Sequence, residues 1–351
     1  MFSLVFSVTN ACNRRCRHCF INRADPPGFL PLELAADILS QARPLGLQRV
    51  HLTGGEPGVY PHLEGLIRLV VDHDLSFTLV TNGHRFRERL LPLLREAAVK
   101  PRLEHISFSL DGSFPAIHEA LRGEGSFQEV LEGVHLCRSL GLPLNLKSVI
   151  NNNNLDDLTD LALLGAALQA RQHQFICPHP TPALIRGKIM PSPQKLMEVG
   201  RWLRTSLAPY VKGEIVIENQ PGEVPVFSYC DAWQSPTVDH EGNLFVCCNL
   251  CSLSTGEEEP SVFGPERLAD LKETPFSEGL KRQFRLWAEI MAARVEEFPR
   301  LSGSDHCLCY WCLRRLGKLY WLKEFPDSPW AAAVLAAHGQ QGKNASRRGG
   351  S

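Results

Sequence analysis

Three cysteines near the start of the chain have the spacing of a metal or cluster site. Cys12, Cys16 and Cys19 form a Cys-x3-Cys-x2-Cys pattern directly after a short apolar run. Structural zinc normally has four protein ligands, whereas an iron–sulfur cube held by three cysteines keeps one iron open to a non-protein ligand. From the triplet alone, unrelated buried thiols and a zinc site completed by His18 or a distant residue remain open alternatives.

Polar and glycine-rich clusters follow four of the later apolar runs. They are Gly54-Gly55-Glu56-Pro57, Thr81-Asn82-Gly83, Ser109-Leu110-Asp111-Gly112 with Arg122 further on, and Asn151 to Asn154. Paired glycines let a backbone approach a ligand without interference from Cβ, a carboxylate suits an ammonium group, and a guanidinium suits a carboxylate. The first two clusters could also be ordinary turns, Arg122 a solvated charge and Asn154 a helix cap.

Together these motifs resemble those of the radical S-adenosylmethionine (SAM) superfamily. The resemblance implies that the open iron binds the amino and carboxylate groups of SAM. It also implies that an electron from the cluster breaks the sulfonium bond to give a 5′-deoxyadenosyl radical. The residues that would contact SAM are Gly54, Gly55, Glu56, Asn82, Ser109, Asp111, Arg122 and Asn151. His18 is a departure, because the family usually has an aromatic residue before the third cysteine, but it removes no ligand.

A second group of cysteines lies beyond Gln220. It consists of Cys230, Cys247, Cys248, Cys251, Cys307, Cys309 and Cys312. Glu241-Gly242-Asn243 predicts a hairpin turn between 237–239 and 244–247. A hairpin with Gly242-x4-Cys247, followed far downstream by a Cys-x2-Cys pair, resembles the auxiliary-cluster domains called SPASM and twitch.

The resemblance favours the shorter, twitch type, because no cysteine follows Cys312. It implies a second [4Fe–4S] cluster held by Cys230, Cys247, Cys309 and Cys312. Cys248, Cys251 or Cys307 could also serve as a ligand there, and zinc would suit the same spacing. The chain is not identified with the molybdopterin-pathway GTP cyclases, which have a Cys-x2-Cys pair where this chain has Cys230 and Trp233.

Two thiols are candidates for direct contact with substrate. Cys177 ends an apolar run in the region that lines the adenine site in the family, next to His179. Cys248 is a thiol outside the expected ligand set that could donate a hydrogen atom or bind substrate. A buried structural thiol is the preferred interpretation of Cys177.

The spacing of apolar residues predicts the elements that position these motifs. Short strands over 2–9, 49–53, 76–81, 105–110, 143–150 and 173–177 alternate with helices near 31–42, 62–74, 88–99, 126–140, 154–168 and 192–207. Repeated β-α units indicate a parallel sheet, and six units favour an open (β/α)6 TIM-like barrel, the fold that the resemblance also implies. The motifs then lie at the carboxyl ends of the strands, where barrel enzymes build active sites.

Three segments are expected in an α/β chain of this kind. Residues 1–220 form the barrel, and residues 221–325 form a small auxiliary-cluster domain with a helical insertion at 252–305. Within the insertion, a stripe of apolar residues at helical spacing predicts the face that packs on the body: Leu280, Phe284, Trp287, Met291, Val295 and Phe298. Residues 326–351 are a helix and a tail of low apolar content that we expect to be disordered.

Composition limits the classes of partner. With 351 residues, 44% apolar content and a net charge of −1, the chain supports a globular core and offers no global field for nucleic acid or an anionic membrane. No run approaches a membrane span and no signal peptide precedes the triplet. Twelve cysteines without an export signal indicate metal or cluster binding in a reducing cytoplasm.

The sequence therefore predicts a cytoplasmic radical SAM enzyme that abstracts a hydrogen atom from a peptide or protein side chain. A crosslink, a thioether or an oxidation would result. The expected partners are a reducing donor such as flavodoxin or ferredoxin and a separate leader-recognition protein, because the triplet begins at residue 12. The alternatives are a radical dehydrogenase of a small alcohol or sugar-like metabolite, and a non-enzymatic iron–sulfur or zinc sensor or scaffold.

Overall fold

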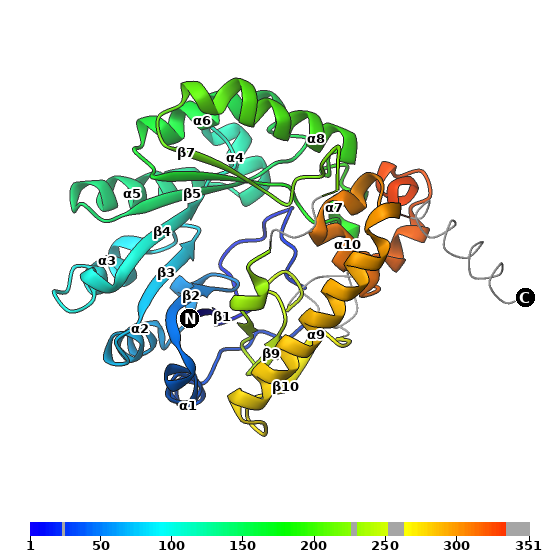
Figure 1. The fold of residues 1–351 in the computed structure, drawn as a ribbon. Coiled ribbons are helices and arrows are strands. Elements are labelled where there is room, and N and C mark those ends of the chain that lie inside the picture. The colour runs from blue at the N-terminus through cyan, green and yellow to red at the C-terminus, as the bar shows by residue number, and fades with distance from the viewer. Residues whose placement is uncertain (23–24, 226–229, 252–262, 335–351) are drawn as a thin grey trace, which may run out of the picture.

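A twisted sheet of parallel strands forms the body of the molecule (Figure 1). The computed structural model describes residues 1–22, 25–225, 230–251 and 263–334. In the order in which they pair, the parallel strands are β1 (Phe2–Ser7), β2 (Leu47–Thr53), β3 (Ser76–Thr81), β4 (Leu103–Ser109), β5 (Leu144–Val149), β6 (Gln172–Ile176) and β7 (Glu214–Glu218). Their carboxyl ends lie at one edge of the sheet, which confirms the predicted partial barrel.

The six predicted strands agree with β1 to β6 to within two residues at each end. The seventh strand, β7, was not predicted. It is a short run in which glutamates flank three β-branched residues, and it pairs in parallel with the outer edge of β6. The barrel is therefore one strand wider than the sequence indicated.

Helices cover the outer face of this sheet (Figure 1). They are α1 (Leu32–Ala42), α2 (Leu63–Asp72), α3 (Leu91–Leu94), α5 (Ser126–Ser139), α6 (Leu158–Ala167) and α8 (Pro193–Trp202), whereas α4 (Pro115–Arg122) and α7 (Pro182–Arg186) lie beyond the carboxyl ends of the strands, beside the triplet loop. The helix predicted near 88–99 is wrong as one element, because a π-helical turn at Phe86–Leu90 precedes the four residues of α3. Pro92 lacks the N–H that a continuous helix would need at this position.

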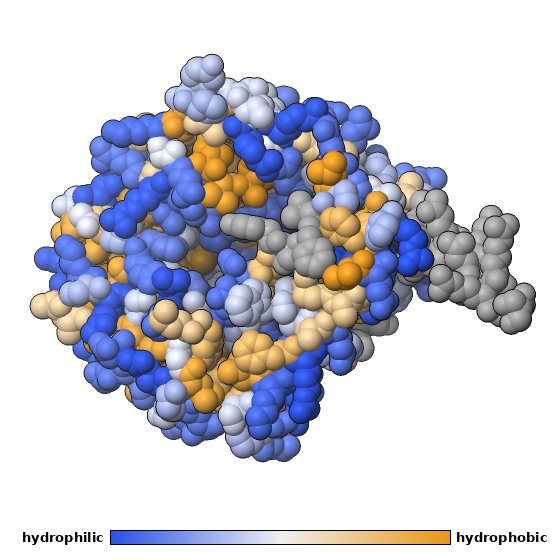
Figure 2. All heavy atoms as spheres, viewed as in Figure 1, coloured by the Kyte–Doolittle hydropathy of each residue, from blue (hydrophilic) through white to orange (hydrophobic). Residues whose placement is uncertain are grey.

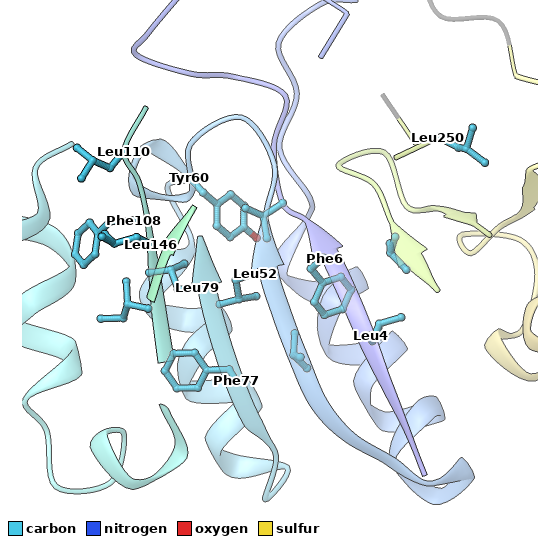
Figure 3. Packing of buried hydrophobic residues seen from close by; sticks show 14 of the residues in the cluster. Leu4, Phe6, Leu52, Tyr60, Phe77, Leu79, Phe108, Leu110, Leu146 and Leu250 are labelled. Atoms are coloured by element: carbon cyan, nitrogen blue, oxygen red, sulfur yellow. The ribbon is translucent and has the colours of Figure 1, made fainter. Parts of the chain in front are cut away.

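The main core lies between the helices and one face of the strands (Figure 3). Leu4, Phe6, Leu52, Phe77 and Leu79 point from neighbouring strands into this layer and are fully buried. Side chains alternate between the two faces of a strand, so the intervening residues face the inside of the barrel. Several of these are polar, as in the pair His51 and Thr78, whose Nδ1 and Oγ1 lie 2.8 Å apart.

The C-terminal part of the chain continues the same sheet. The predicted hairpin is confirmed, because β8 (Thr237–Val238) and β9 (Asn243–Phe245) pair antiparallel, and β10 (Arg267–Asp270) follows on β9. β8 also pairs in parallel with β1. The proposed boundary near residue 220 stays a prediction, but both sides of it belong to one sheet of ten strands.

A long helix, α9 (Phe276–Glu297), runs beside the hairpin strands (Figure 1). The predicted apolar stripe is confirmed at Leu280 and Trp287, which pack against the core, and wrong at Phe284 and Val295, whose side chains are 50% and 54% exposed. The buried face also includes Phe276, Gly279 and Gln283. The helix is rotated because buried polar side chains on it bond to backbone carbonyls: Gln283 Nε2 donates to Ala232 O at 2.7 Å.

The next helix, α10 (Leu308–Arg315), carries Cys309 and Cys312, and residues 329–334 form the helix that was predicted after residue 326. A separate 3-10 turn, Tyr320–Glu324, follows α10. Figure 2 shows hydrophobic residues along the side of α9 that meets the hairpin strands, in a face that is otherwise largely hydrophilic. Residues 335–351, which include the predicted tail, and residues 252–262 of the insertion lie outside the described residues. No described helix is both long and apolar enough to cross a bilayer.

Replacement of Gln283 by Ala should lower the free energy of unfolding by about 1–3 kcal/mol, because the carbonyls of Ala232 and Val246 would lose a buried donor. Phe284→Ala, one residue along the same helix, should change it by less than about 0.5 kcal/mol. Thermal and urea denaturation of the two variants measure the difference. A larger effect at Phe284 would mean that the predicted stripe is the packed face.

Candidate functional site

The cysteine triplet lies in a long loop that leaves the carboxyl end of β1. In Figure 1 this dark-blue segment crosses the middle of the view toward α7. Backbone bonds attach it to the end of β2, where Gly55 N donates to Thr9 O at 2.6 Å and Glu56 N donates to Ala11 O at 3.0 Å. Arg17 N donates to Leu121 O at 2.8 Å, which attaches the loop to α4. The three thiols, all half-buried, are thus fixed over the carboxyl ends of the strands.

Close packing requires glycine at both positions after β2, and the sequence alone did not reveal this. A Cβ on Gly54 would lie 2.4 Å from Thr9 O, and one on Gly55 would lie 2.0 Å from Ala11 O. Gly54 also has a φ of +133°, a conformation that L side chains rarely adopt. These glycines let the triplet loop approach the end of β2, and their contact with SAM stays a prediction.

Glu56 connects the ends of β2 and β3 through a buried carboxylate. It accepts hydrogen bonds from Thr81 Oγ1 at 2.7 Å, Asn82 N at 2.7 Å and Gly58 N at 2.9 Å. Burial raises the pKa of this carboxyl to about 7, although the three bonds act against that rise. The carboxylate that was expected to meet an ammonium group therefore already has protein partners.

Asn82 extends this connection to the triplet. Its Nδ2 donates to Asn13 Oδ1 at 2.9 Å and lies 3.7 Å from Cys12 Sγ. Asn13 was not predicted as a site residue, and its position next to Cys12 is the only sequence signal that could have identified it. The structure thus brings Glu56, Asn82 and the first cysteine of the triplet together, as the barrel prediction required.

A buried ion pair joins the end of β4 to the end of α4. Arg122 Nε donates to Asp111 Oδ2 at 2.5 Å, and Val149 N donates to Asp111 Oδ1 at 2.8 Å. Burial alone would raise the pKa of Asp111, but Arg122, with His18 and His118, outweighs it and lowers the pKa to about 2. His18 Nε2 lies 3.4 Å from Asp111 Oδ2, so the unusual residue of the triplet faces this carboxylate.

The asparagines after β5 serve the backbone. Asn151 Oδ1 accepts from Asn153 N at 2.9 Å and its Nδ2 donates to Val149 O at 2.8 Å. The expected helix cap at Asn154 is wrong, because its side chain caps no helix and bonds instead to Asp111 O at 2.9 Å. Ser109, at the end of β4, is half-buried. Contacts of Ser109 and Asn151 with SAM stay predictions.

The second group of cysteines gathers around one cavity. Cys230, Cys247, Cys309 and Cys312 line it, and most of its other walls are apolar side chains such as Val246, Leu250, Trp287, Ile290 and Leu308. This is the set of four that the sequence favoured. The remaining thiols do not line the cavity: Cys248 is exposed, while Cys251 and Cys307 are buried beside it.

Two polar residues complete the lining of this cavity. Asn249 is one, and its backbone N–H donates to Cys247 Sγ at 3.4 Å. The other is His179, which follows the region expected to line the adenine site. Thiols in an apolar enclosure are the donor set that an iron–sulfur cube takes. No group of three or more His, Cys, Asp or Glu side chains in the described residues is arranged to hold a single metal ion.

The two candidate catalytic thiols differ in exposure. Cys177 directly follows β6 and is fully buried, and burial raises the pKa of its thiol. This placement agrees with the preferred structural interpretation. Cys248 lies in the loop after β9 and is exposed among the described residues. A catalytic role for either thiol stays a prediction.

Comparison with known proteins agrees with this geometry over the barrel. Residues 6–164 match the Radical SAM superfamily. The chain is 32% identical to GTP 3′,8-cyclase of Alkaliphilus oremlandii over 166 residues, which are 45% of this chain and 50% of that protein. It is 29% identical to PqqA peptide cyclase of Ruegeria pomeroyi over 182 residues, 50% of this chain and 46% of that protein. The chain thus spans about half the length of the curated relatives it matches.

A solved structure extends the likeness beyond the matched region. Streptococcus suis SuiB bound to precursor peptide SuiA has a TM-score of 0.62 and 13% identity, covering 80% of this chain and 64% of SuiB. At this identity the likeness shows the fold alone. It includes the parallel-strand barrel that carries the triplet.

Replacement of Arg122 by Met should destabilise the protein by about 3–5 kcal/mol, because Asp111 would keep a buried charge without its partner. The double variant Asp111→Asn/Arg122→Met should regain part of that loss. Denaturation of the single and double variants, without added SAM, measures the coupling. Equal stability of wild type and Arg122→Met would show that Arg122 serves only a ligand.

Proposed function

We propose that this chain, which carries a radical SAM domain over residues 6–164, is an enzyme that abstracts a hydrogen atom from a peptide or protein side chain. Members of the superfamily use a [4Fe–4S] cluster and SAM. When bound, these cofactors supply a one-electron cleavage of SAM to methionine and a 5′-deoxyadenosyl radical, which takes the hydrogen atom and leaves as 5′-deoxyadenosine. The observation that carries the proposal is the triplet loop fixed over the strand ends and bonded to Asn82 through Asn13.

The residues at the strand ends have distinct proposed tasks. Cys12, Cys16 and Cys19 hold the cube and leave one iron open to SAM. Glu56 and Asp111 fix the loops around that site through their buried bonds, and Asn82 and Ser109 present polar groups toward the inside of the barrel. Glu56, Asp111 and Asn82, whose side chains already have hydrogen-bond partners, thus orient the site, while the half-buried Ser109 is available to a ligand.

The second cysteine cavity is proposed to hold an auxiliary [4Fe–4S] cluster. Its four thiols match the four ligands that such a cluster needs, and its apolar walls exclude water. The cluster would accept the electron that the substrate radical releases when an oxidation, a crosslink or a thioether is formed. Zinc at the same thiols would remove this electron acceptor and favour a redox-neutral rearrangement.

A peptide substrate is supported by the names of similar proteins, which include a peptide cyclase and a structure with a bound precursor peptide. The rival is a small metabolite, because a GTP cyclase is equally similar over the barrel. The amount of 5′-deoxyadenosine formed with each kind of substrate distinguishes these two possibilities. An enzyme that acts on a peptide forms little 5′-deoxyadenosine when only small metabolites are supplied. Full turnover of a purified metabolite without any peptide would refute the peptide substrate, and a sensor or scaffold would cleave no SAM at all.

A basic depression next to the triplet supports an acidic electron donor such as flavodoxin or ferredoxin. It has a volume of about 510 Å³ and is lined by Cys16, Cys19 and three exposed arginines, namely Arg15, Arg17 and Arg186. The Arg186 guanidinium lies 5.9 Å from the centre of the Phe325 ring, which holds it at the rim. No acidic side chain lines this depression among the described residues, so an acidic protein surface would find only positive charge beside the proposed cube.

Iron analysis of anaerobically purified protein should give about eight irons per chain, and about four after replacement of the three triplet cysteines by Ala. Cys16→Ala alone should abolish 5′-deoxyadenosine formation from reduced enzyme and SAM, whereas Cys137→Ala, at a buried thiol in α5, should retain it. Retained activity in Cys16→Ala would refute the site. About one zinc and no iron in the triple variant would refute the auxiliary cluster.

The double variant Arg15→Glu/Arg17→Glu should lose about tenfold or more in the rate of 5′-deoxyadenosine formation with flavodoxin as donor, because the encounter loses its charge attraction. Dithionite needs no docking surface, so its rate should change little. Arg285→Glu, an exposed arginine on α9, serves as the control with both reductants. An equal loss with dithionite and flavodoxin would contradict a docking role for these arginines.

A further inference from the structure

His179 is a buried side chain whose ring nitrogens lack a partner at full hydrogen-bond geometry among the described residues. It lies between Pro178 and Pro180, just beyond β6, and is 7% exposed. The Asn249 side chain lies within reach of one ring nitrogen, which leaves the other without any polar group of the described residues beside it, and neither Nδ1 nor Nε2 has a partner at full hydrogen-bond geometry. A buried polar group without a partner costs about 1–3 kcal/mol, and such groups are rare in folded proteins.

The ring is held in a defined position. Its centroid lies 5.9 Å from that of Tyr310 in an edge-to-face contact, and Tyr310 Oη donates to Pro178 O at 3.1 Å. Trp330 packs against Tyr310 and donates from Nε1 to Pro191 O at 2.8 Å. Two aromatic residues from the C-terminal part thus clamp the loop that carries His179. Because the His179 ring is held in place, motion of the side chain does not explain why its nitrogens lack a partner.

The surroundings of the ring indicate what the partner is. His179 lines the cavity of Cys230, Cys247, Cys309 and Cys312, whose other walls apart from Asn249 are apolar. Four thiols already complete the ligand set of a cube, so the imidazole is not needed as a ligand. An imidazole carries at least one N–H in either protonation state, and the sulfur atoms of a cluster accept hydrogen bonds.

We propose that His179 donates a hydrogen bond from its ring to a sulfur atom of the cluster in the second cavity and thereby raises the reduction potential of that cluster. The inference rests on the proposed function, because it requires an iron–sulfur cluster there. Hydrogen bonds to cluster sulfurs stabilise the more negative, reduced state, and apolar walls supply few other donors. His179 is a positioning residue, supplied by the barrel to a cluster that C-terminal thiols hold.

This arrangement suits the electron flow of the proposed reaction. An auxiliary cluster that accepts an electron from a substrate radical must have a potential high enough to take it. The apolar cavity works against that, because a low dielectric disfavours added negative charge. The N–H of His179 and the N–H of Asn249 on Cys247 Sγ are the donors that oppose this effect.

The test uses the full chain with Cys12, Cys16 and Cys19 replaced by Ala, so that only the second cluster is present. In this background, His179→Phe keeps a ring beside Tyr310 and removes the N–H, and His179→Gln keeps an N–H donor. The midpoint potential of the cluster is measured by a redox titration followed by electron paramagnetic resonance. His62→Phe, the same change at an exposed position before α2, is the control.

His179→Phe should make reduction of the cluster about tenfold less favourable, a fall of about 59 mV for one electron. His179→Gln should recover part of the shift, and His62→Phe should show none. An unchanged potential in His179→Phe, with the iron content retained, would overturn the inference while leaving the proposed function intact. Loss of iron in His179→Phe would mean that the ring is a ligand and would also overturn it. A parent background without iron would refute the auxiliary cluster itself.

Discussion

The approach of two backbones at the end of β2 is the constraint on which the candidate site depends. The loop that follows β1 lies so close to Gly54 and Gly55 that a Cβ at either position would overlap a carbonyl oxygen. The same contact buries Glu56, whose carboxylate accepts hydrogen bonds from Thr81 and Asn82 at the end of β3. Three cysteines on a flexible loop would form a cluster site only at a large cost in conformational entropy. Here the loop is fixed by bonds to β2 and α4 before any ligand arrives.

The two groups of cysteines lie in different electrostatic surroundings. Around the triplet, buried charges are paired, as in Asp111 with Arg122, and exposed arginines lie on the solvent side. Around the second group the walls are apolar, and the polar groups are few and specific. One surrounding admits a charged cofactor and solvent, and the other excludes both. The two environments fit a site where SAM and substrate bind and a site that only transfers electrons.

Much of the fold and the positions of the motifs followed from the sequence, because buried parallel strands give clear apolar runs and glycines mark close approaches. The four cysteines of the second cavity could also be chosen from their spacing. The strand β7 was missed because its flanking glutamates shorten the apolar run. The buried face of α9 was predicted only in part because two buried polar residues, Gln283 and Arg294, bond to backbone carbonyls that no pattern in the sequence reveals. His179 could not be assigned to the second cavity, because its neighbours there are far away in the chain.

The pairing of β8 with β1 also bears on the order in which the protein is made. One edge of β1 bonds to β2 early in synthesis, but its other edge receives a partner only when residues 237 and 238 have left the ribosome. Until then the first strand of the sheet offers open backbone groups to any other chain. This interval is the one in which the edge of β1 is open to wrong pairing. A truncation before the hairpin would expose the same edge permanently and favour aggregation.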